Sequence, residues 1–145
     1  MSKAKDYLLQ MIEYESRVDH LNADIFMLEG MLLKITPTLK MDQVSSSGNH
    51  DKLGNLMAER LDKMQMRDEA WAQYVDFRKL AWETLRKIEK EEFREILEKR
   101  YFENKSLKEI SMELIKDYRY IRRLHGRALQ AYEKVMEKEG AGEDG

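Results

Sequence analysis

Four arginines lie close together in the stretch YRYIRRLHGRAL, residues 118–129, among two tyrosines. They are Arg119, Arg122, Arg123 and Arg127. A guanidinium group can bind phosphate or a guanine edge through two parallel N–H groups, and a tyrosine adds a hydroxyl and an apolar ring. Residues 116–127 hold five basic residues and one acidic residue, in a chain whose net charge is −2. This concentration of positive charge predicts contact with nucleic acid.

The elements needed to position these arginines can be read from capping residues. Ser106 and Glu109 form the pattern S-x-x-E, which opens a short helix that should run to Leu114. Asp117 is suited to cap the next helix, so we expect a helix-turn-helix whose second, recognition helix covers about residues 117–138. Its first turns would meet DNA in the major groove.

Helical spacing separates an inner from an outer face of this pair. Apolar residues that would hold the two helices together are Ile110, Leu114, Ile121 and Leu124. The opposite face would then carry the basic cluster and the small Gly126, with flanking lysines placed to reach phosphates. The residues predicted to contact DNA are Tyr118, Arg119, Tyr120, Arg122, Arg123, Arg127, Lys105, Lys108 and Lys116. A basic face can also be a solvated surface alone, and His125 is equally compatible with a phosphate contact and a surface position.

The same segment resembles a known family. FREILEKRYFENKSLKEISMEL followed by YRYIRRLHGRALQAY is similar to region 4 of bacterial primary sigma factors. A closer resemblance, from end to end of the chain, is to phage late-transcription regulators of the ArpU/RinA type, including the loop DQVSSSGNHDKL. The resemblance implies a DNA-binding regulator of phage genes in the cytoplasm of a bacterial host. Its partners would be double-stranded DNA and host RNA polymerase.

One position departs from the usual helix-turn-helix pattern. Ile115 stands at the turn, where a glycine is common. A β-branched residue is strained in the left-handed conformation that such a turn needs. We therefore expect either a longer turn or a first helix that extends by one more residue.

The N-terminal half carries a regular apolar seam. From Ala4 to Ile35, apolar residues recur in alternating steps of three and four, which is a heptad pattern. A helix over residues 3–36 should end at Pro37, and a second, less regular helix should run from about residue 51 to 89. Two alternatives stay open, because the seam can close a hairpin within one chain or join two chains. The residues predicted for self-association are Val18, Leu21, Ile25, Leu28 and Leu32.

The predicted fold is therefore all-α. Residues 1–90 form a long coiled-coil helical hairpin with a loop at about 37–50, residues 91–138 form the small helix-turn-helix module, and residues 139–145 form a disordered tail. Trp71 and Trp82 are expected in the core. The serine-rich stretch within 42–52 has no predicted role.

Other kinds of chemistry have no support in the sequence. There is no cysteine, no phosphate-binding or dinucleotide-binding glycine motif and no hydrolase motif, and the three histidines lie far apart. We expect no catalytic residue, metal or cofactor. No apolar run is long enough to cross a membrane, and MSKAKDYLLQ has no signal-peptide pattern, so we expect a cytoplasmic protein.

Two functions compete with a transcription regulator. A viral DNA-packaging subunit of the small-terminase kind can also join a helix-turn-helix to an oligomerising helical part. A coiled-coil interaction module without DNA binding is the other alternative. Ring assembly would indicate the packaging subunit, and a lack of nucleic-acid affinity would indicate the interaction module.

Overall fold

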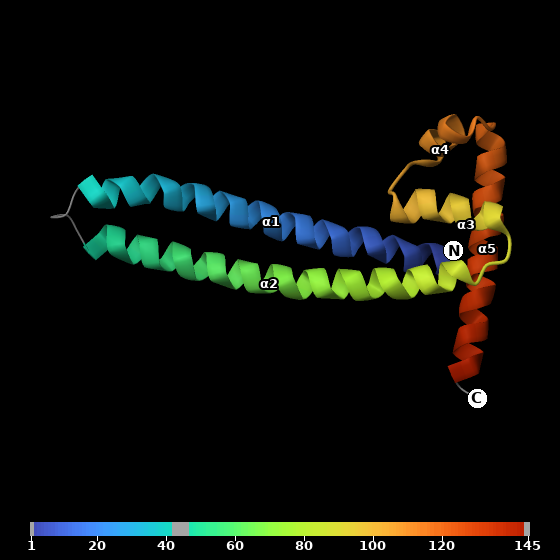
Figure 1. The fold of residues 1–145 in the computed structure, drawn as a ribbon, viewed down its shortest axis with the longest axis horizontal. Coiled ribbons are helices and arrows are strands. Elements are labelled where there is room, and N and C mark those ends of the chain that lie inside the picture. The colour runs from blue at the N-terminus through green and yellow to red at the C-terminus, as the bar shows by residue number, and fades with distance from the viewer. Residues whose placement is uncertain (1, 42–46, 144–145) are drawn as a thin grey trace. The chain divides into compact units, whose positions relative to one another are not determined.

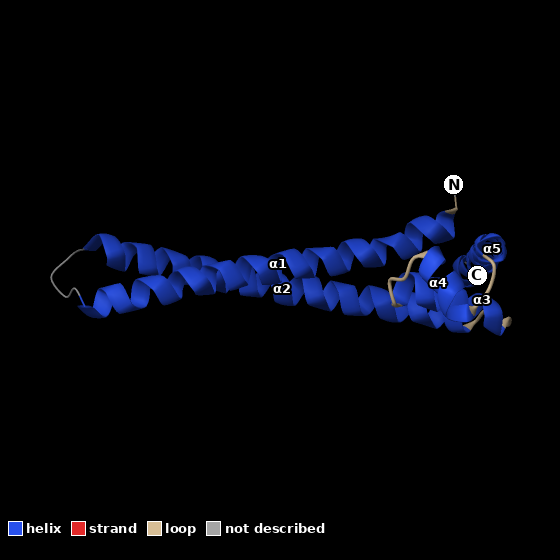
Figure 2. Ribbon diagram, turned by 90° about the horizontal axis from the view of Figure 1, so that it is seen from above, coloured by secondary structure: helices blue, strands red, loops and turns tan. Residues whose placement is uncertain are grey.

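The computed structural model describes residues 2–41 and 47–143, with side chains for 2–35 and 50–140 (Figure 1). These residues form helices and contain no strand, which confirms the all-α prediction (Figure 2). The elements are α1 (Lys3–Met41), α2 (Ser47–Arg86), α3 (Glu91–Leu97), a π-helical turn η1 (Glu98–Phe102), α4 (Leu107–Leu114) and α5 (Tyr118–Glu143).

The chain divides into two compact units. The first combines Met1–Glu13 with Tyr74–Gly145, and the second is Tyr14–Gln73. The boundary predicted near residue 90 therefore lies inside the first unit. The physical reason is a shared core, since the start of α1 and the end of α2 bury side chains together with α3, η1, α4 and α5.

In the second unit, α1 and α2 lie side by side and run in opposite directions (Figures 1 and 2). Val18, Leu21, Ile25 and Leu28 are buried within the single chain, and Leu32 is half-buried. Ion pairs fix the alignment, with Arg60 2.9 Å from Glu29 and Lys63 3.2 Å from Asp24. The seam of α1 thus packs against α2 of the same chain.

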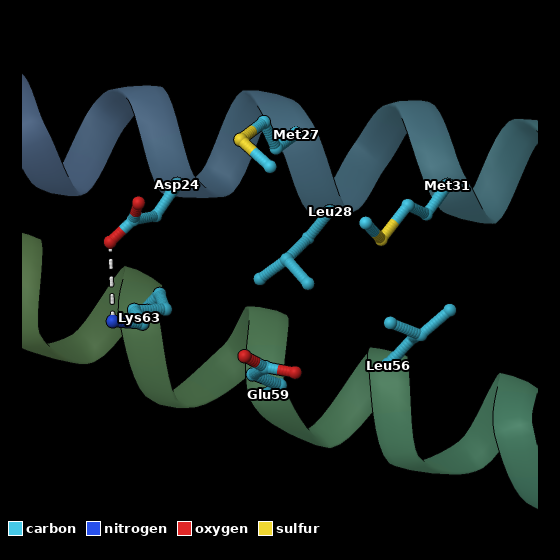
Figure 3. A pocket seen from close by; sticks show the side chains of 7 residues that line it. All are labelled: Asp24, Met27, Leu28, Met31, Leu56, Glu59 and Lys63. Carbon is cyan, nitrogen blue, oxygen red and sulfur yellow. Dashed lines mark hydrogen bonds and ion pairs between the residues drawn. The ribbon is translucent and has the colours of Figure 1, made fainter.

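Figure 3 shows this packing at one point along the pair. Leu28 points from α1 toward α2, Leu56 points back, and the Asp24–Lys63 ion pair lies beside them. A cavity of about 250 Å³ opens here, lined by Asp24, Met27, Leu28, Met31, Leu56, Glu59 and Lys63. Apolar contact and charge pairing together set the alignment of the two helices.

The apolar side of α2 differs from the expectation at Trp71. Its side chain is 54% exposed, although we expected it in the core. The neighbours Ala70 and Tyr74 occupy the buried side of α2 here, and one residue along a helix turns the side chain by about 100°. Trp82, in contrast, is half-buried and meets the Phe102 ring edge-on, with 5.2 Å between ring centroids.

Three predicted helix ends are wrong. Helix α1 continues through Pro37 to Met41, although a proline inside a helix cannot donate the backbone hydrogen bond of its position. Helix α2 begins at Ser47, which shortens the loop predicted at 37–50; residues 42–46 lie outside the described residues. Helix α5 continues to Glu143, so residues 139–143 are helical rather than disordered.

A contact with α2 accounts for the helical continuation at Glu139. Its carboxylate accepts hydrogen bonds from the Thr84 hydroxyl at 3.0 Å and from Lys87 Nζ at 2.7 Å. Both partners belong to the same unit as α5. The polar composition of the tail gave no indication of these contacts, so the sequence predicted disorder there.

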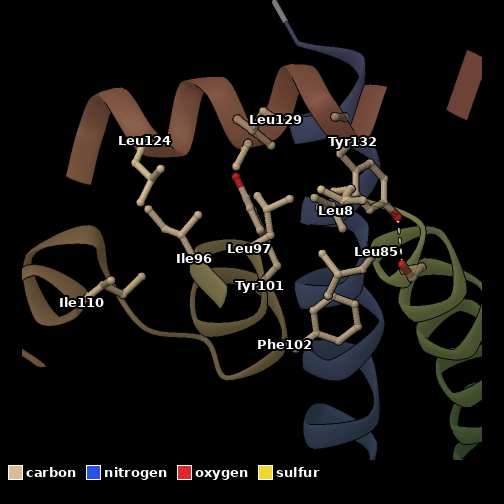
Figure 4. Close-up of a cluster of buried hydrophobic side chains, with 14 of the residues drawn as sticks. Leu8, Leu85, Ile96, Leu97, Tyr101, Phe102, Ile110, Leu124, Leu129 and Tyr132 are labelled. Atoms are coloured by element: carbon tan, nitrogen blue, oxygen red, sulfur yellow. Dashed lines mark hydrogen bonds between the residues drawn. The ribbon is translucent and has the colours of Figure 1, made fainter. Parts of the chain in front are cut away.

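The core of the first unit supports α5 along its buried side (Figure 4). Its largest fully buried side chains are Leu8, Met11, Leu85, Ile96, Leu97, Ile110, Ile121 and Tyr132. Burying each large apolar side chain stabilises the fold by about 1.5–3 kcal/mol. The Tyr132 hydroxyl donates to the Ala81 carbonyl at 3.0 Å, which satisfies the one polar atom of this side chain.

The π-helical turn η1 contacts α4. The Glu103 N–H donates to the Glu98 carbonyl at 3.0 Å, a spacing of five residues that widens the helix. Tyr101 and Phe102 are consecutive and both are buried. Asn104 then adopts a positive φ of 60°, which asparagine tolerates better than most residues, and the chain leaves the helix.

Candidate nucleic-acid interface

Local hydrogen bonds set the beginnings of α4 and α5. The Ser106 hydroxyl accepts from the Glu109 N–H at 3.1 Å, and the Asp117 carboxylate accepts from the Arg119 N–H at 2.8 Å. Each cap satisfies a backbone donor that has no partner within its own helix. The capping residues expected from the sequence therefore begin both helices, and residues 115–117 form the turn between them.

The end of α4 is a Schellman motif with an isoleucine at its left-handed position. The Lys116 N–H donates to the Ser111 carbonyl at 3.0 Å, and the Ile115 N–H donates to the Met112 carbonyl at 3.4 Å. Ile115 has φ 54° and ψ 52°. Glycine usually fills this position, and a residue with a Cβ costs about 1–2 kcal/mol there. The turn is thus short and strained: it is not longer, and α4 ends at Leu114 without the further helical residue that was the other alternative.

Burial separates the two faces of α5 as the helical spacing predicted. Ile121 and Leu124 are buried against Ile110 of α4, and Leu114 is half-buried. Arg119, Arg122, Arg123, Gly126 and Arg127 are exposed on the other side. A Cβ built on Gly126 would meet nothing within 4 Å, so this part of the surface is open to a ligand.

Three of the arginines surround one surface depression. Arg119, Arg122 and Arg123 line an open hollow of about 430 Å³. Among the residues that the structure describes, none of the three forms an ion pair with a carboxylate. Their guanidinium groups are therefore available to an external anion.

The two predicted tyrosines have different surroundings. The Tyr118 ring is 46% exposed, and the Arg122 guanidinium lies over it, 5.9 Å from the ring centroid. Tyr120 is half-buried, and its hydroxyl donates to the Glu92 carboxylate of α3. This hydrogen bond raises the pKa of Tyr120. Tyr118 thus belongs to the arginine surface, whereas Tyr120 links α5 to α3.

The predicted lysines also divide into two kinds. Lys105 pairs with Glu113 at 2.7 Å and with Glu103 at 3.1 Å, and these hydrogen bonds raise its pKa. Glu113 also binds Lys99 at 2.6 Å, and the Lys105 hydrogen bond is the main reason that its own pKa is lowered. Lys108 and Lys116 are exposed and, within the described residues, have no carboxylate partner.

His125 faces the protein interior. Its Nε2 lies 2.8 Å from the Tyr101 hydroxyl, and the two rings stack with 5.7 Å between centroids. Burial, with repulsion from Arg100 and Lys5, lowers the pKa of His125 to about 4. Burial also raises the pKa of Tyr101 to about 12. His125 therefore holds α5 against η1 and does not face the arginine surface.

Sequence reasoning assigned no binding role to two apolar residues beside the arginines, although it had marked one of them, Ile115, as unusual at the turn. Met112 is 72% exposed and Ile115 is 89% exposed. The signal available for Ile115 was its place at the turn, and α4 periodicity places Met112 away from the buried Ile110. Both lie near the basic surface, at the end of α4 and in the turn that follows it.

Comparison of the chain with protein-family models, curated protein sequences and solved structures finds no match. Within the described residues, no cluster of His, Asp and Glu has the grouping of a metal site. The helices in this part of the chain include none with the length and apolar character needed to cross a bilayer. The arginine depression is therefore interpreted from its own geometry and charge.

Proposed function

We propose that the chain is a sequence-specific DNA-binding transcription regulator. In this proposal α4 and α5 act as a helix-turn-helix, and the first turns of α5 enter the major groove. The observation that carries the proposal is the hollow lined by Arg119, Arg122 and Arg123, three exposed cations without carboxylate partners. They stand on the first two turns of a capped helix, which is the part of a recognition helix that meets base edges.

We propose different roles for the predicted residues according to their contacts. Arg119, Arg122 and Arg123 would provide base-edge and phosphate contacts, and Tyr118 would support Arg122. Arg127, Lys108 and Lys116 are exposed and would bind flanking phosphates. Lys105 and Tyr120 contribute less to DNA binding in this proposal, because their polar groups are occupied by Glu113 and Glu92.

The resemblance to phage late-transcription regulators supplies the biological setting of the proposal. The regulated genes would be phage genes, and host RNA polymerase would be the protein partner in the bacterial cytoplasm. A small helix-turn-helix module gains affinity by binding paired half-sites as a dimer. We therefore include self-association through the long helices, which would use side chains that the α1–α2 pair leaves exposed, namely Phe26, Leu33, Met57 and Leu61.

The proposal is tested with a triple variant, Arg119→Ala, Arg122→Ala and Arg123→Ala. Duplexes bound by the parent protein are first selected from a random pool, and affinity for them is then measured for both proteins. Each bidentate arginine contact provides about 1–3 kcal/mol, so a single substitution should weaken binding by about 5- to 150-fold. The triple variant should bind at the level of unselected DNA.

A charge-matched control separates a specific contact from net charge. Lys79, Arg86 and Lys138 are exposed cations of the same compact unit that do not line the hollow, and all three are replaced by Ala in the control. The control should keep most of its affinity for the selected duplex. Equal losses in the two triple variants, or unchanged binding by the arginine variant, would contradict the recognition assignment.

Salt dependence and subunit number distinguish the competing functions. Log affinity should fall with log salt by about 0.9 per phosphate contacted, and the arginine variant should have a smaller slope. An absence of nucleic-acid affinity in the parent would favour the interaction module. A closed ring of many chains would favour the DNA-packaging subunit.

A further inference from the structure

The left-handed position at the end of α4 holds a residue that neither folding nor solubility explains. Ile115 adopts φ 54°, where a β-branched side chain is strained and glycine or asparagine fits better. Its side chain is 89% exposed, so packing within the described residues does not offset that strain. Residues held in strained backbone conformations cluster at active sites, ligand contacts and switch regions.

The surroundings of Ile115 indicate which ligand it meets. Met112 and Tyr118, three residues away on either side, are also exposed, so an apolar edge surrounds the turn. Arg119 and Arg122 follow directly on α5 and line the cationic hollow. The one acidic group in the turn, Asp117, is occupied in capping the Arg119 N–H. An apolar edge beside unpaired cations fits a polyanion that also carries an apolar feature.

Duplex DNA offers one such feature in its major groove. Proteins bind phosphates through charge and most base edges through hydrogen bonds, whereas the C5-methyl group of thymine is apolar and projects into the groove. Resting on the proposed function, we infer that Ile115 contacts a thymine methyl group and contributes to sequence selection. Met112 and Tyr118 border this contact, and the adjacent arginines hold the backbone and neighbouring bases.

Replacing thymidine by deoxyuridine removes only the C5-methyl group at each substituted position, so it tests the contact directly. The selected duplex is synthesised once with thymine and once with deoxyuridine at every thymine position, and both are titrated with the parent protein. Burying one methyl group corresponds to about a three- to fivefold change in affinity. The parent should bind the thymine duplex more tightly by at least that factor.

The variant Ile115→Gly removes the side chain and also relieves the left-handed strain. The variant should melt at a temperature several degrees higher than the parent. It should nevertheless bind the thymine duplex less tightly than the parent does, and it should no longer prefer the thymine duplex to the deoxyuridine duplex. This opposite response of stability and affinity separates a ligand contact from damage to the fold. Leu80→Ala, at an exposed leucine of α2 in the same unit, is the control and should keep the preference.

Each outcome decides between the inference and the proposed function. A parent that binds the selected DNA with equal affinity in both forms overturns the thymine contact and leaves DNA binding intact. A preference that survives Ile115→Gly overturns the role of this residue. A parent that selects no DNA from the pool overturns the proposed function, and the thymine contact with it; an apolar edge that serves a protein partner would give this result or the first one.

Discussion

The half-buried His125 makes the unfolding free energy of the first unit dependent on pH. His125 is half-buried against Tyr101, and burial with repulsion from Arg100 and Lys5 lowers its pKa to about 4. An unfolded histidine titrates near 6.5, so between pH 6.5 and 4 the unfolded chain binds more protons than the folded chain. Stability contributed by neutral His125 is therefore complete above pH 6.5 and is lost as the pH falls toward 4.

The magnitude follows from the size of the shift. One pKa unit corresponds to about 1.36 kcal/mol, so a full shift from 6.5 to about 4 would correspond to roughly 3 kcal/mol. The ring is only partly buried, and solvent screens part of this energy. We therefore expect about 1–2 kcal/mol of unfolding free energy to be lost through this group between pH 7 and pH 4.5.

Urea unfolding followed by circular dichroism measures the effect when the parent is compared with His125→Gln. The glutamine does not titrate and can still hydrogen-bond the Tyr101 hydroxyl. All carboxylates titrate in both proteins, so the difference between the two pH dependences isolates His125. The variant should lose about 1–2 kcal/mol less than the parent between pH 7 and pH 4.5.

The control is His20→Gln, which changes an exposed histidine of α1 that is bonded to Ser16 of the same helix. His125→Gln should change the pH dependence of the parent more than this substitution does. The reasoning would be refuted if His125→Gln and the parent lost the same free energy. A titration of the His125 ring by NMR with its midpoint near 6.5 would refute it as well.

Three further predictions concern packing and self-association. Tyr132→Phe should lower the urea-derived unfolding free energy by about 0.5–1.5 kcal/mol, because the substitution removes the hydrogen bond that the buried hydroxyl donates to the Ala81 carbonyl. Ile25→Asp with Leu28→Asp should unfold the α1–α2 pair, seen as lost helicity, since both side chains are buried within one chain. Phe26→Ser with Leu33→Ser should keep helicity and lower the subunit number in sedimentation, and a parent that already sediments as a monomer contradicts this last expectation.

The parts of the structure that depend on neighbouring residues in the chain were predictable from sequence. The caps at Ser106 and Asp117, and the division of α5 into a buried and an exposed face, need only residues within one or two helical turns. The heptad pattern of α1 likewise predicted the burial of Val18, Leu21, Ile25 and Leu28, because its spacing is regular over many turns, but it missed the buried Leu8.

Contacts between distant segments were not predictable in the same way. The bond from Tyr120 to Glu92, the stacking of His125 on Tyr101 and the anchoring of Glu139 by Thr84 join elements far apart in the chain. No periodicity or motif marks such pairs. The π-helical turn at Glu98–Phe102 was not predicted either, because no local sequence pattern marks it.

The structure shows that the basic residues of the C-terminal half differ in their surroundings. In sequence, the basic residues of this half form one population, but in the fold many of them serve internal partners. Lys99 and Lys105 bind Glu113, Arg94 donates to the Ile88 and Glu89 carbonyls, and Arg78 donates to the Phe102 carbonyl at 3.3 Å.

The exposed arginines on the first turns of α5 have no such partners within the described residues, although acidic side chains are abundant in the chain. Unpaired cations on one helix face repel one another, and this repulsion lowers the stability of the fold. A bound polyanion would remove this repulsion, and it would therefore raise the unfolding free energy of the first unit as it binds.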